Sequence, residues 1–417
     1  MTGKPAVDGA IERIILVVES PLSIRDADRF GISLLEDAGF VVEVWEVAPL
    51  TLPTAEHSDV VRPAGVTLVR LATMGELREA CASLSRHDAV VSLIGRQGPS
   101  TVRCAHVLAV LAASRALWCA ASFRASWERT MPDVQTAAFA PDLTLPQHLI
   151  LRCWVAGKSF ARRVLSWSGR GRPAMEIRPL DIAWVATSPH EFSAGLVGPD
   201  TRIIPVHALD LDMLGRSCSP DPTAGGFIAY LDGLGPLHPD NIALGVASAG
   251  PSARDYFGFL NRGLTWLAAQ TGLPVIVAAH PRAPRDGSLE AWYDGLEVRF
   301  GRTAETIAAA DLVVMSYPSD ALAMVVALGK PLIVITSQRT SRDERVMARA
   351  VARLLRARLY TVERLPGRLR PPIPDARRYA RIRERFVKRA GSAAGSYWAC
   401  VAASLGHAGR AGGHPEC

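Results

Sequence analysis

Short apolar runs rich in Val and Ile alternate with segments of helical periodicity along most of this 417-residue chain. Near the N-terminus the run RIILVVE (13–19) precedes a single helical pattern at 26–38, which Gly39 ends before FVVEVWEV begins a second run. An apolar strand, an amphipathic helix and another apolar strand form a β-α-β unit, which is typical of a parallel sheet covered by helices. The alternation therefore predicts an α/β fold.

The same alternation begins again after the Pro- and Gly-rich stretch RSCSPDPTAGG. Clusters of these residues mark linkers between domains. We therefore expect two Rossmann-like domains facing a central cleft. The predicted boundaries are an N-terminal domain at 1–215, a linker at 216–226, a C-terminal domain at 227–373, and a basic C-terminal helix (about 375–389) and tail at 374–417.

Basic residues are concentrated near the C-terminus. The chain has 47 Lys and Arg against 40 Asp and Glu, and the segment from Arg339 to Arg389 alone has 17 against 5. Such a segment fits a solvated helical face, an acidic substrate or an anionic membrane surface. Since no nucleic-acid-binding motif accompanies it, we predict no nucleic-acid partner and favour peripheral contact with the anionic inner face of the cell membrane.

The cysteines and the N-terminus predict a cytoplasmic protein. The seven cysteines are scattered and never form a CxxC pair, which argues against a disulfide framework and a structural zinc site. The first residues, MTGKPAVDGAIER, have no apolar run after their charges, so they do not resemble a secretory signal. No stretch reaches the roughly 18 apolar residues that a membrane span needs.

Two predicted strands between Val275 and Thr336 end on polar residues. VIVAAHPR closes on His280-Pro281-Arg282, and DLVVMS continues into YPSD before a helical segment. Ligands bind at the carboxyl ends of parallel strands, and the amides that open the next helix favour phosphate. The segment therefore predicts a site for a phosphate-bearing donor. The chain has no GxGxxG and no GxxxxGK[ST] loop, which disfavours a dehydrogenase and a P-loop NTPase.

Three short motifs follow one another in this half of the chain: Leu231-Asp232-Gly233, His280-Pro281 and Ser319-Asp320. In order and spacing they resemble the acidic-Gly, His-Pro and Ser-Ser/Thr motifs of bacterial surface-polysaccharide transferases of the sialyltransferase and Kdo-transferase type. These belong to the GT-B class of glycosyltransferases. The wider pattern, including YLDGLGPLHPD and LGKPLI, is also similar to a group of poorly characterised polysaccharide-locus proteins.

The resemblance implies an enzyme that moves a sugar from a nucleotide-activated donor, with CMP-linked sugars among the candidates, without a metal or cofactor. The acceptor would be a glycan or lipid-linked glycan of the capsule or lipopolysaccharide. Two alternatives stay open. A nucleotide-sugar epimerase can use the same two-lobed fold, and a non-catalytic protein of this fold would bind a glycan or a partner.

Asp232 and His280 are the candidate catalytic residues. A carboxylate at the end of a strand, facing the cleft, would take the proton from an acceptor hydroxyl, although an Asp before Gly233 also suits a turn. His280 would donate a hydrogen bond to the departing phosphate, with Pro281 fixing the backbone and Arg282 adding a permanent cation.

The other donor-binding candidates lie at predicted helix starts. Arg302 and Thr303 would contact the nucleotide, unless Thr303 only caps its helix. Ser316, Ser319 and the amides after Pro318 would form a phosphate cradle, with helix capping by Ser319 as the alternative. Asp320 departs from the family pattern, because a carboxylate repels a nearby phosphate.

Further candidates are secondary. His238 and Asp240 would supply an alternative base, or a turn and a helix cap. Arg25 and Arg29, together with Asp28, would meet an acidic acceptor or form ion pairs at a helix start. Asp210 and Asp212 have the DxD spacing of metal-dependent transferases and would share one face of a strand in TRIIPVHALDLD. Because that stretch lies just before the linker, we predict no metal site there.

Overall fold

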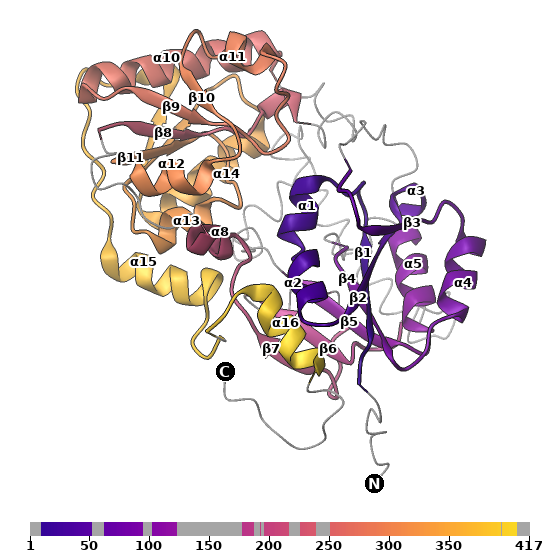
Figure 1. Cartoon of the computed structure of the whole chain (residues 1–417). Coiled ribbons are helices and arrows are strands. Elements are labelled where there is room, and N and C mark those ends of the chain that lie inside the picture. Colours follow the sequence, from indigo (N-terminus) through magenta and orange to yellow (C-terminus); the bar gives the residue numbers. More distant parts are fainter. Residues whose placement is uncertain are drawn as a thin grey trace, which may run out of the picture. The chain divides into compact units, whose positions relative to one another are not determined.

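The structure is a computed structural model, and it describes residues 10–51, 62–94, 102–122, 177–186, 192, 196–216, 226–238, 251–392 and 394–406. The chain divides into two compact units (Figure 1). Described residues up to Leu209 and again from Lys388 form the first unit, and those from Asp210 to Val387 form the second. Each unit is a parallel sheet with helices, so the prediction of two Rossmann-like α/β domains is confirmed.

The first unit contains a seven-stranded parallel sheet in the order β3-β2-β1-β4-β5-β6-β7. Its central strands are buried on both faces, as their near-continuous apolar sequences require. The strands are β1 Arg13–Val18, β2 Val41–Glu46, β3 Thr67–Arg70, β4 Asp88–Ser92, β5 Leu117–Ser122, β6 Ile182–Val185 and β7 Arg202–Pro205.

The helical pattern at 26–38 forms two helices and not the predicted single one. The chain turns at Gly31, whose φ of 59° and ψ of 33° lie in the left-handed region that favours glycine. A helix cannot continue through that conformation, so the first helix ends at Arg29 and a new one starts at Ile32. The helices of this unit are α1 Ile24–Arg29, α2 Ile32–Asp37, α3 Ala48–Thr51, α4 Met74–Ala82, α5 Val102–Ala112 and α16 Tyr397–Gly406.

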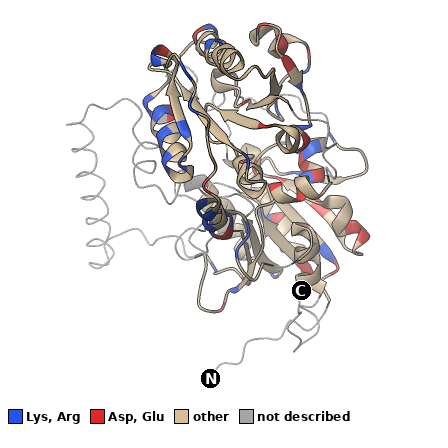
Figure 2. Ribbon diagram, turned by 90° about the vertical axis from the view of Figure 1, so that its left-hand side faces the viewer, with Lys and Arg blue, Asp and Glu red and all other residues tan. Residues whose placement is uncertain are grey.

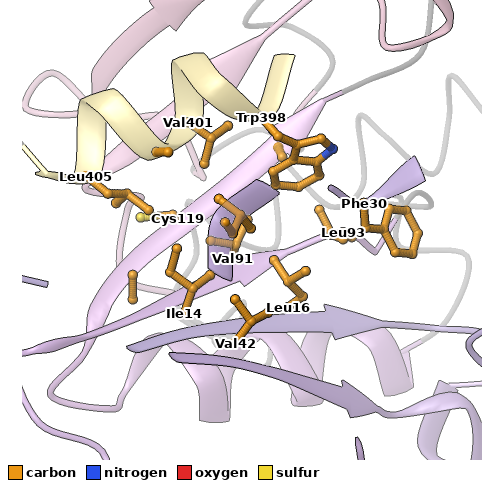
Figure 3. Close-up of a cluster of buried hydrophobic side chains, with 14 of the residues drawn as sticks. Ile14, Leu16, Phe30, Val42, Val91, Leu93, Cys119, Trp398, Val401 and Leu405 are labelled. Carbon is orange, nitrogen blue, oxygen red and sulfur yellow. The ribbon is translucent and has the colours of Figure 1, made fainter. Parts of the chain in front are cut away.

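The last helix, α16, completes the core of the first unit. Trp398, Val401 and Leu405 are at most 1% exposed and point onto the strands of the sheet (Figure 3). Three polar contacts fix the helix: the Tyr397 hydroxyl donates to the Ser122 carbonyl, the Trp398 indole to the Arg29 carbonyl, and the Trp184 indole to the Ser404 hydroxyl. The segment predicted as a tail thus contains a buried helix.

The second unit contains a six-stranded parallel sheet in the order β10-β9-β8-β11-β12-β13. The pairing of β8 with β9 and β11 sets Leu231 level with Ala278 on one side and Met315 on the other. Residues that follow these three strands therefore emerge at the same edge. The strands are β8 Ile228–Leu231, β9 Val275–Ala278, β10 Glu297–Arg299, β11 Leu312–Met315, β12 Leu332–Thr336 and β13 Arg358–Thr361.

The helices of the second unit mostly follow the predicted pattern. The predicted basic helix at 375–389 is shorter, because regular α-helix ends at Ile382 and a π-helical turn follows. The elements are α8 Asp210–Arg216, η3 Gly235–Leu237, α10 Ala253–Thr271, α11 Ser288–Trp292, α12 Thr303–Ala309, α13 Leu322–Ala327, α14 Arg342–Leu355, η5 Val362–Arg364, α15 Ala376–Ile382 and η6 Arg383–Val387.

Most of the predicted linker, 217–225, lies outside the described residues. Within the described part of the chain, no helix combines the length and the apolar character that crossing a membrane requires.

Gly31 tests how tightly α16 is held. A Cβ at this position would lie 2.5 Å from the Trp398 ring, whereas one at Gly39 would meet nothing within 4 Å, although both glycines have a positive φ. We expect Gly31→Ala to lower the free energy of unfolding of the first unit by about 2–4 kcal/mol, from strain plus overpacking. The control Gly39→Ala should cost only the strain, about 1–2 kcal/mol.

Urea unfolding followed by tryptophan fluorescence measures both variants. Equal losses for the two glycines would show that Trp398 does not pack against Gly31 in solution.

Candidate functional site

The second sheet has its topological switch point between β8 and β11. From β8 the chain adds β9 and β10 on one side, whereas β11 on the other side leads on to β12 and β13. Ligands of open parallel sheets bind outside the carboxyl ends of the strands at such a point. The two loops meet here, because a Cβ on Gly233 would lie 3.8 Å from the Cβ of Tyr317. The predicted donor segments therefore adjoin the expected ligand position.

Asp232 follows β8 and is only 3% exposed. One carboxylate oxygen accepts hydrogen bonds from the Leu234 amide at 2.8 Å and from the Tyr293 hydroxyl at 2.7 Å. The other oxygen accepts the His280 amide at 3.3 Å. The carboxylate therefore connects the ends of β8 and β9 with the residue that follows α11.

These contacts change the role expected of Asp232. Its position at the strand end agrees with the sequence prediction, but its expected exposure at the site does not, because the carboxylate points into the unit. A general base must reach the acceptor hydroxyl directly or through one water. The geometry fits Asp232 better as a residue that positions His280.

His280 begins a β-turn that Pro281 favours. The Ala283 amide donates to the His280 carbonyl at 2.8 Å, which places Pro281 at the second turn position, where its fixed φ is suited. The Arg282 amide donates to the Nδ1 atom of His280 at 3.2 Å. Because Nδ1 accepts a hydrogen bond, we infer that the neutral ring has its proton on Nε2. The donor nitrogen of the His280 ring is therefore Nε2, and the neighbouring Arg282 is exposed.

His238 lies against His280. It follows the short 3-10 helix η3, and the two imidazole rings meet edge to face with centroids 4.8 Å apart. Both side chains are half-buried. The structure therefore brings together the loops after β8 and β9, and His238, a secondary candidate in the sequence, becomes a neighbour of the principal one. Asp240 lies outside the described residues.

Ser316 has a different environment from the one predicted. Its hydroxyl lies between the hydroxyls of Tyr230 at 2.8 Å and Tyr256 at 2.9 Å, and the residue is buried. Burial raises the pKa of Tyr256 well above its usual value. Burial also raises the pKa of Tyr230, so both tyrosines stay protonated. The Ser316 hydroxyl is held inside the unit by these two hydroxyl groups.

The segment after Ser316 is the more accessible part of the predicted cradle. Tyr317 is 41% exposed, and Ser319 and Asp320 are half-buried. The Ser319 hydroxyl accepts the Ala321 amide at 3.2 Å, and the Asp320 carbonyl accepts the Ala323 amide. Ser319 thus fixes the turn ahead of α13, whose N-cap is Ala321.

Arg302 and Thr303 lie farther along the edge, after β10. Arg302 is the N-cap of α12, and Thr303 is its first residue, so Thr303 is not the cap. The Arg302 guanidinium donates to the Glu305 carboxylate at 3.0 Å, and both side chains are exposed. The sheet order separates this pair from β8 by the whole of β9.

The first sheet has its own switch point, between β1 and β4. Arg25 lies in α1 just beyond β1 and forms a 3.9 Å ion pair with Asp26. Arg29 closes the same helix, and its carbonyl binds the indole of Trp398. The buried Glu46 at the end of β2, which sequence inspection did not single out, accepts the Leu22 amide at 2.7 Å.

Asp210 and Asp212 do not lie on a strand. The stretch expected to be one strand ends at Pro205, and both carboxylates lie in the first turn of α8, where they suit the positive end of the helix. The shared face that a strand would give them is therefore absent. Among the described residues, no group of three or more His, Cys, Asp or Glu is placed to hold a metal ion.

Three tyrosines that hold the site were not predicted. Tyr293 donates to Asp232, while Tyr230 and Tyr256 hold Ser316, and all three are at most 2% exposed. In the sequence they look like ordinary core aromatics. Only the three-dimensional positions of their hydroxyl groups distinguish them.

No family model and no curated protein matches the chain. Among solved structures it is similar to the calicheamicin glycosyltransferase CalG4, with 15% identity, 96% of this chain and 100% of that chain covered, and a TM-score of 0.48. It is also similar to Arabidopsis thaliana UGT89C1 complexed with UDP, with 12% identity, 95% of this chain and 100% of that chain covered, and a TM-score of 0.46. A third similar structure is MurG of Acinetobacter baumannii, with 11% identity, 85% of this chain and 87% of that chain covered, and a TM-score of 0.38. Similarity at this level does not identify the reaction.

The Asp232 contacts predict a stability effect. In Asp232→Asn, one of the three donors must face an amide N–H₂ group in place of an oxygen, so we expect the free energy of unfolding of the second unit to fall by about 1–3 kcal/mol. Tyr293→Phe removes a single donor and should cost about 0.5–1.5 kcal/mol. Urea titration measures both. An Asp232→Asn protein as stable as the wild type would contradict these hydrogen bonds.

A pH dependence follows from the same burial. Desolvation raises the pKa of Asp232, and the hydrogen bonds from Leu234, Tyr293 and His280 offset this only in part. A carboxyl whose folded-state pKa lies above its unfolded value, about 3.9, stabilises the fold most below that value and less as the pH rises through the folded-state pKa. The stability difference between wild type and Asp232→Asn should therefore narrow as the pH rises. A difference that widened would contradict the raised pKa.

Proposed function

We propose that this protein is a glycosyltransferase that transfers a sugar from a nucleotide-activated donor to a surface polysaccharide. One observation supports this most directly. At the switch point of a Rossmann-like sheet, a buried carboxylate fixes the loop on which His280 and Arg282 lie together. Such a pair is suited to an oxygen that gains negative charge as a bond to it breaks.

The proposed reaction gives each residue one task. The bond between the sugar's anomeric carbon and the donor phosphate breaks, and the bonding electrons stay on the phosphate oxygen. His280 and Arg282 stabilise that oxygen. A new bond forms between the acceptor oxygen and the anomeric carbon, and the acceptor's proton passes to a base. Asp232 holds the His280 loop in place.

His238 is the base that the geometry favours. It is half-buried beside His280 and so remains accessible, whereas Asp232 is only 3% exposed. A positioned histidine is a common general base and contributes about 10²–10⁴-fold to such reactions. With this change, the alternative base of the sequence prediction takes the role first given to Asp232.

The rest of the donor would lie along the same edge. The turn from Tyr317 to Asp320 borders the switch point, so the Ser319 hydroxyl and the exposed Tyr317 ring are the proposed contacts there. Arg302 and Thr303 would reach only a part of the donor that extends past β9. Because side-chain cations and imidazoles supply the charge stabilisation, the proposed transfer is metal-independent and uses no cofactor.

The acceptor side of the proposal is broader. The acceptor would be a glycan or lipid-linked glycan of the capsule or lipopolysaccharide, with Arg25 near the carboxyl edge of the first sheet as a contact for acidic sugars. A lipid-linked acceptor requires the enzyme to work at the inner face of the membrane, in peripheral contact with anionic lipid.

Nucleotide binding tests the donor class. We expect one of CMP, UDP, GDP and TDP to raise the melting temperature, since a ligand that binds only the folded state stabilises it. His280→Ala and Arg282→Ala should reduce that shift, whereas Arg115→Ala, an exposed arginine just before β5, should leave it unchanged. If no nucleotide stabilised the wild type, the proposed function would be wrong.

Turnover separates the two histidines. With the nucleotide-sugar of the stabilising base and a polysaccharide acceptor, we expect His238→Asn to lower kcat by about 10²–10⁴-fold while donor affinity stays near the wild-type value. His280→Ala should lower both kcat and the affinity for the donor. Release of free nucleotide measures the reaction, and near-normal turnover of His238→Asn would exclude His238 as the base.

A further inference from the structure

The C-terminal part of the second unit has a strong excess of arginine. Between Arg339 and Val387, where this unit ends, the sequence contains 15 basic and 5 acidic residues. Just over half of the exposed basic ones lie on α14, on α15 and on the segment that joins β13 to α15. In Figure 2, which turns the left-hand side of Figure 1 toward the viewer, blue residues recur along both helices.

Direct contacts place the two helices together. The Arg378 guanidinium on α15 donates to the carbonyls of Arg353 and Leu354 at the end of α14. Arg356, which follows α14, forms a 3.0 Å ion pair with Asp375, the N-cap of α15. The C-terminus of α14 and the N-terminus of α15 therefore form one continuous surface.

Two stripes of exposed arginine meet at this junction. On α14, Arg349 and Arg353 are one turn apart, and on α15 the same spacing separates Arg377 from Arg381. Residues four apart share a helix face, so each pair projects to one side. We call Arg349, Arg353, Arg377, Arg381 and Ile373 the basic face.

Three of the five acidic residues in this segment are held by backbone amides, and Glu384 is exposed among Arg381, Arg383 and Arg385. Glu344 accepts the Ser341 amide in a capping box, Glu363 accepts the Gln338 amide, and Asp375 accepts the Arg378 amide. These three carboxylates therefore bind backbone amide groups at helix starts and in a loop. The arginine stripes thus keep a net positive field toward solvent.

Ile373 adds an apolar point to this positive surface. It is 86% exposed, the highest value among the exposed large hydrophobic side chains of the described residues. It lies in the sequence PPIP, directly before α15, and the prolines restrict the backbone that presents it. An exposed isoleucine on a rigid segment is unfavourable in water and suits the headgroup region of a bilayer.

We propose that the basic face binds an anionic lipid surface, with the arginines at the headgroups and Ile373 inserted among them. The proposal rests on the proposed function, in which a lipid-linked acceptor lies at the membrane. A single-stranded nucleic acid is the less suitable partner, because stacking of bases needs exposed aromatic rings. Among the described residues, Tyr317 is the one large aromatic among the exposed hydrophobics, and it lies at the switch point.

Vesicle co-sedimentation of the full chain tests this surface. We expect binding to vesicles that contain phosphatidylglycerol and not to vesicles of phosphatidylcholine alone. The triple variant Arg349→Gln, Arg377→Gln and Arg381→Gln should lose binding by roughly a hundredfold, about fivefold for each arginine. High salt should have a similar effect on the wild type.

A matched control removes the same charge elsewhere. Arg78, Arg86 and Arg115 are exposed arginines of the first unit, and their triple replacement by Gln should leave vesicle binding close to the wild-type level. Ile373→Ser should weaken vesicle binding several-fold, by the same factor at low and at high salt, since insertion is not screened.

Nucleotide stabilisation, measured in parallel, distinguishes this proposal from the proposed function. The basic-face variant should retain the nucleotide-induced rise in melting temperature. The proposal would be overturned if the basic-face variant bound vesicles with the same affinity as the wild type. It would also be overturned if the wild type bound a single-stranded oligonucleotide and no vesicle. A wild type that bound vesicles but no nucleotide would leave this surface standing and reject the proposed function.

Discussion

The geometry of the candidate site depends on one buried carboxylate. Asp232 receives three hydrogen bonds from groups that are 2, 48 and 61 residues away in sequence. Burying a charge or a carboxyl group is costly unless such donors satisfy it. Once they do, the ends of two neighbouring strands cannot move independently. The imidazole pair that follows these strands therefore has a fixed base beneath it.

Much of the fold could be predicted from the sequence, because buried parallel strands are near-continuous apolar runs and the helices between them are amphipathic. The strand ends at Asp232 and His280 followed from that pattern. The roles of these two residues could not be predicted in the same way, since the exposure of each side chain depends on contacts with residues distant in sequence. Nothing near Tyr293 indicates that its hydroxyl binds Asp232. Likewise, nothing near Gly31 indicates that Trp398, far along the chain, packs against it where the helical pattern divides.

The second unit uses arginine in two ways. At the switch point, Arg282 follows a strand in a tight turn and adjoins an imidazole, an arrangement that suits a single phosphate group. On α14 and α15 arginines repeat along helix faces, which suits an extended array of negative charges. The net charge of +7 conceals this division. Local geometry, more than the amount of charge, distinguishes a substrate contact from a surface contact.

The path of the chain has a consequence for biosynthesis. The strands of the first unit precede the second unit in the chain, yet Tyr397, Trp398 and Val401 of α16, which fill the core of the first unit, follow it. Domains usually fold as they emerge from the ribosome, N-terminal first. Here the first unit must wait, with an apolar face of its sheet uncovered, while the whole of the second unit is translated. Chaperone dependence should therefore be greatest during that interval, and a nonsense mutation just before α16 should harm the first unit more than the second.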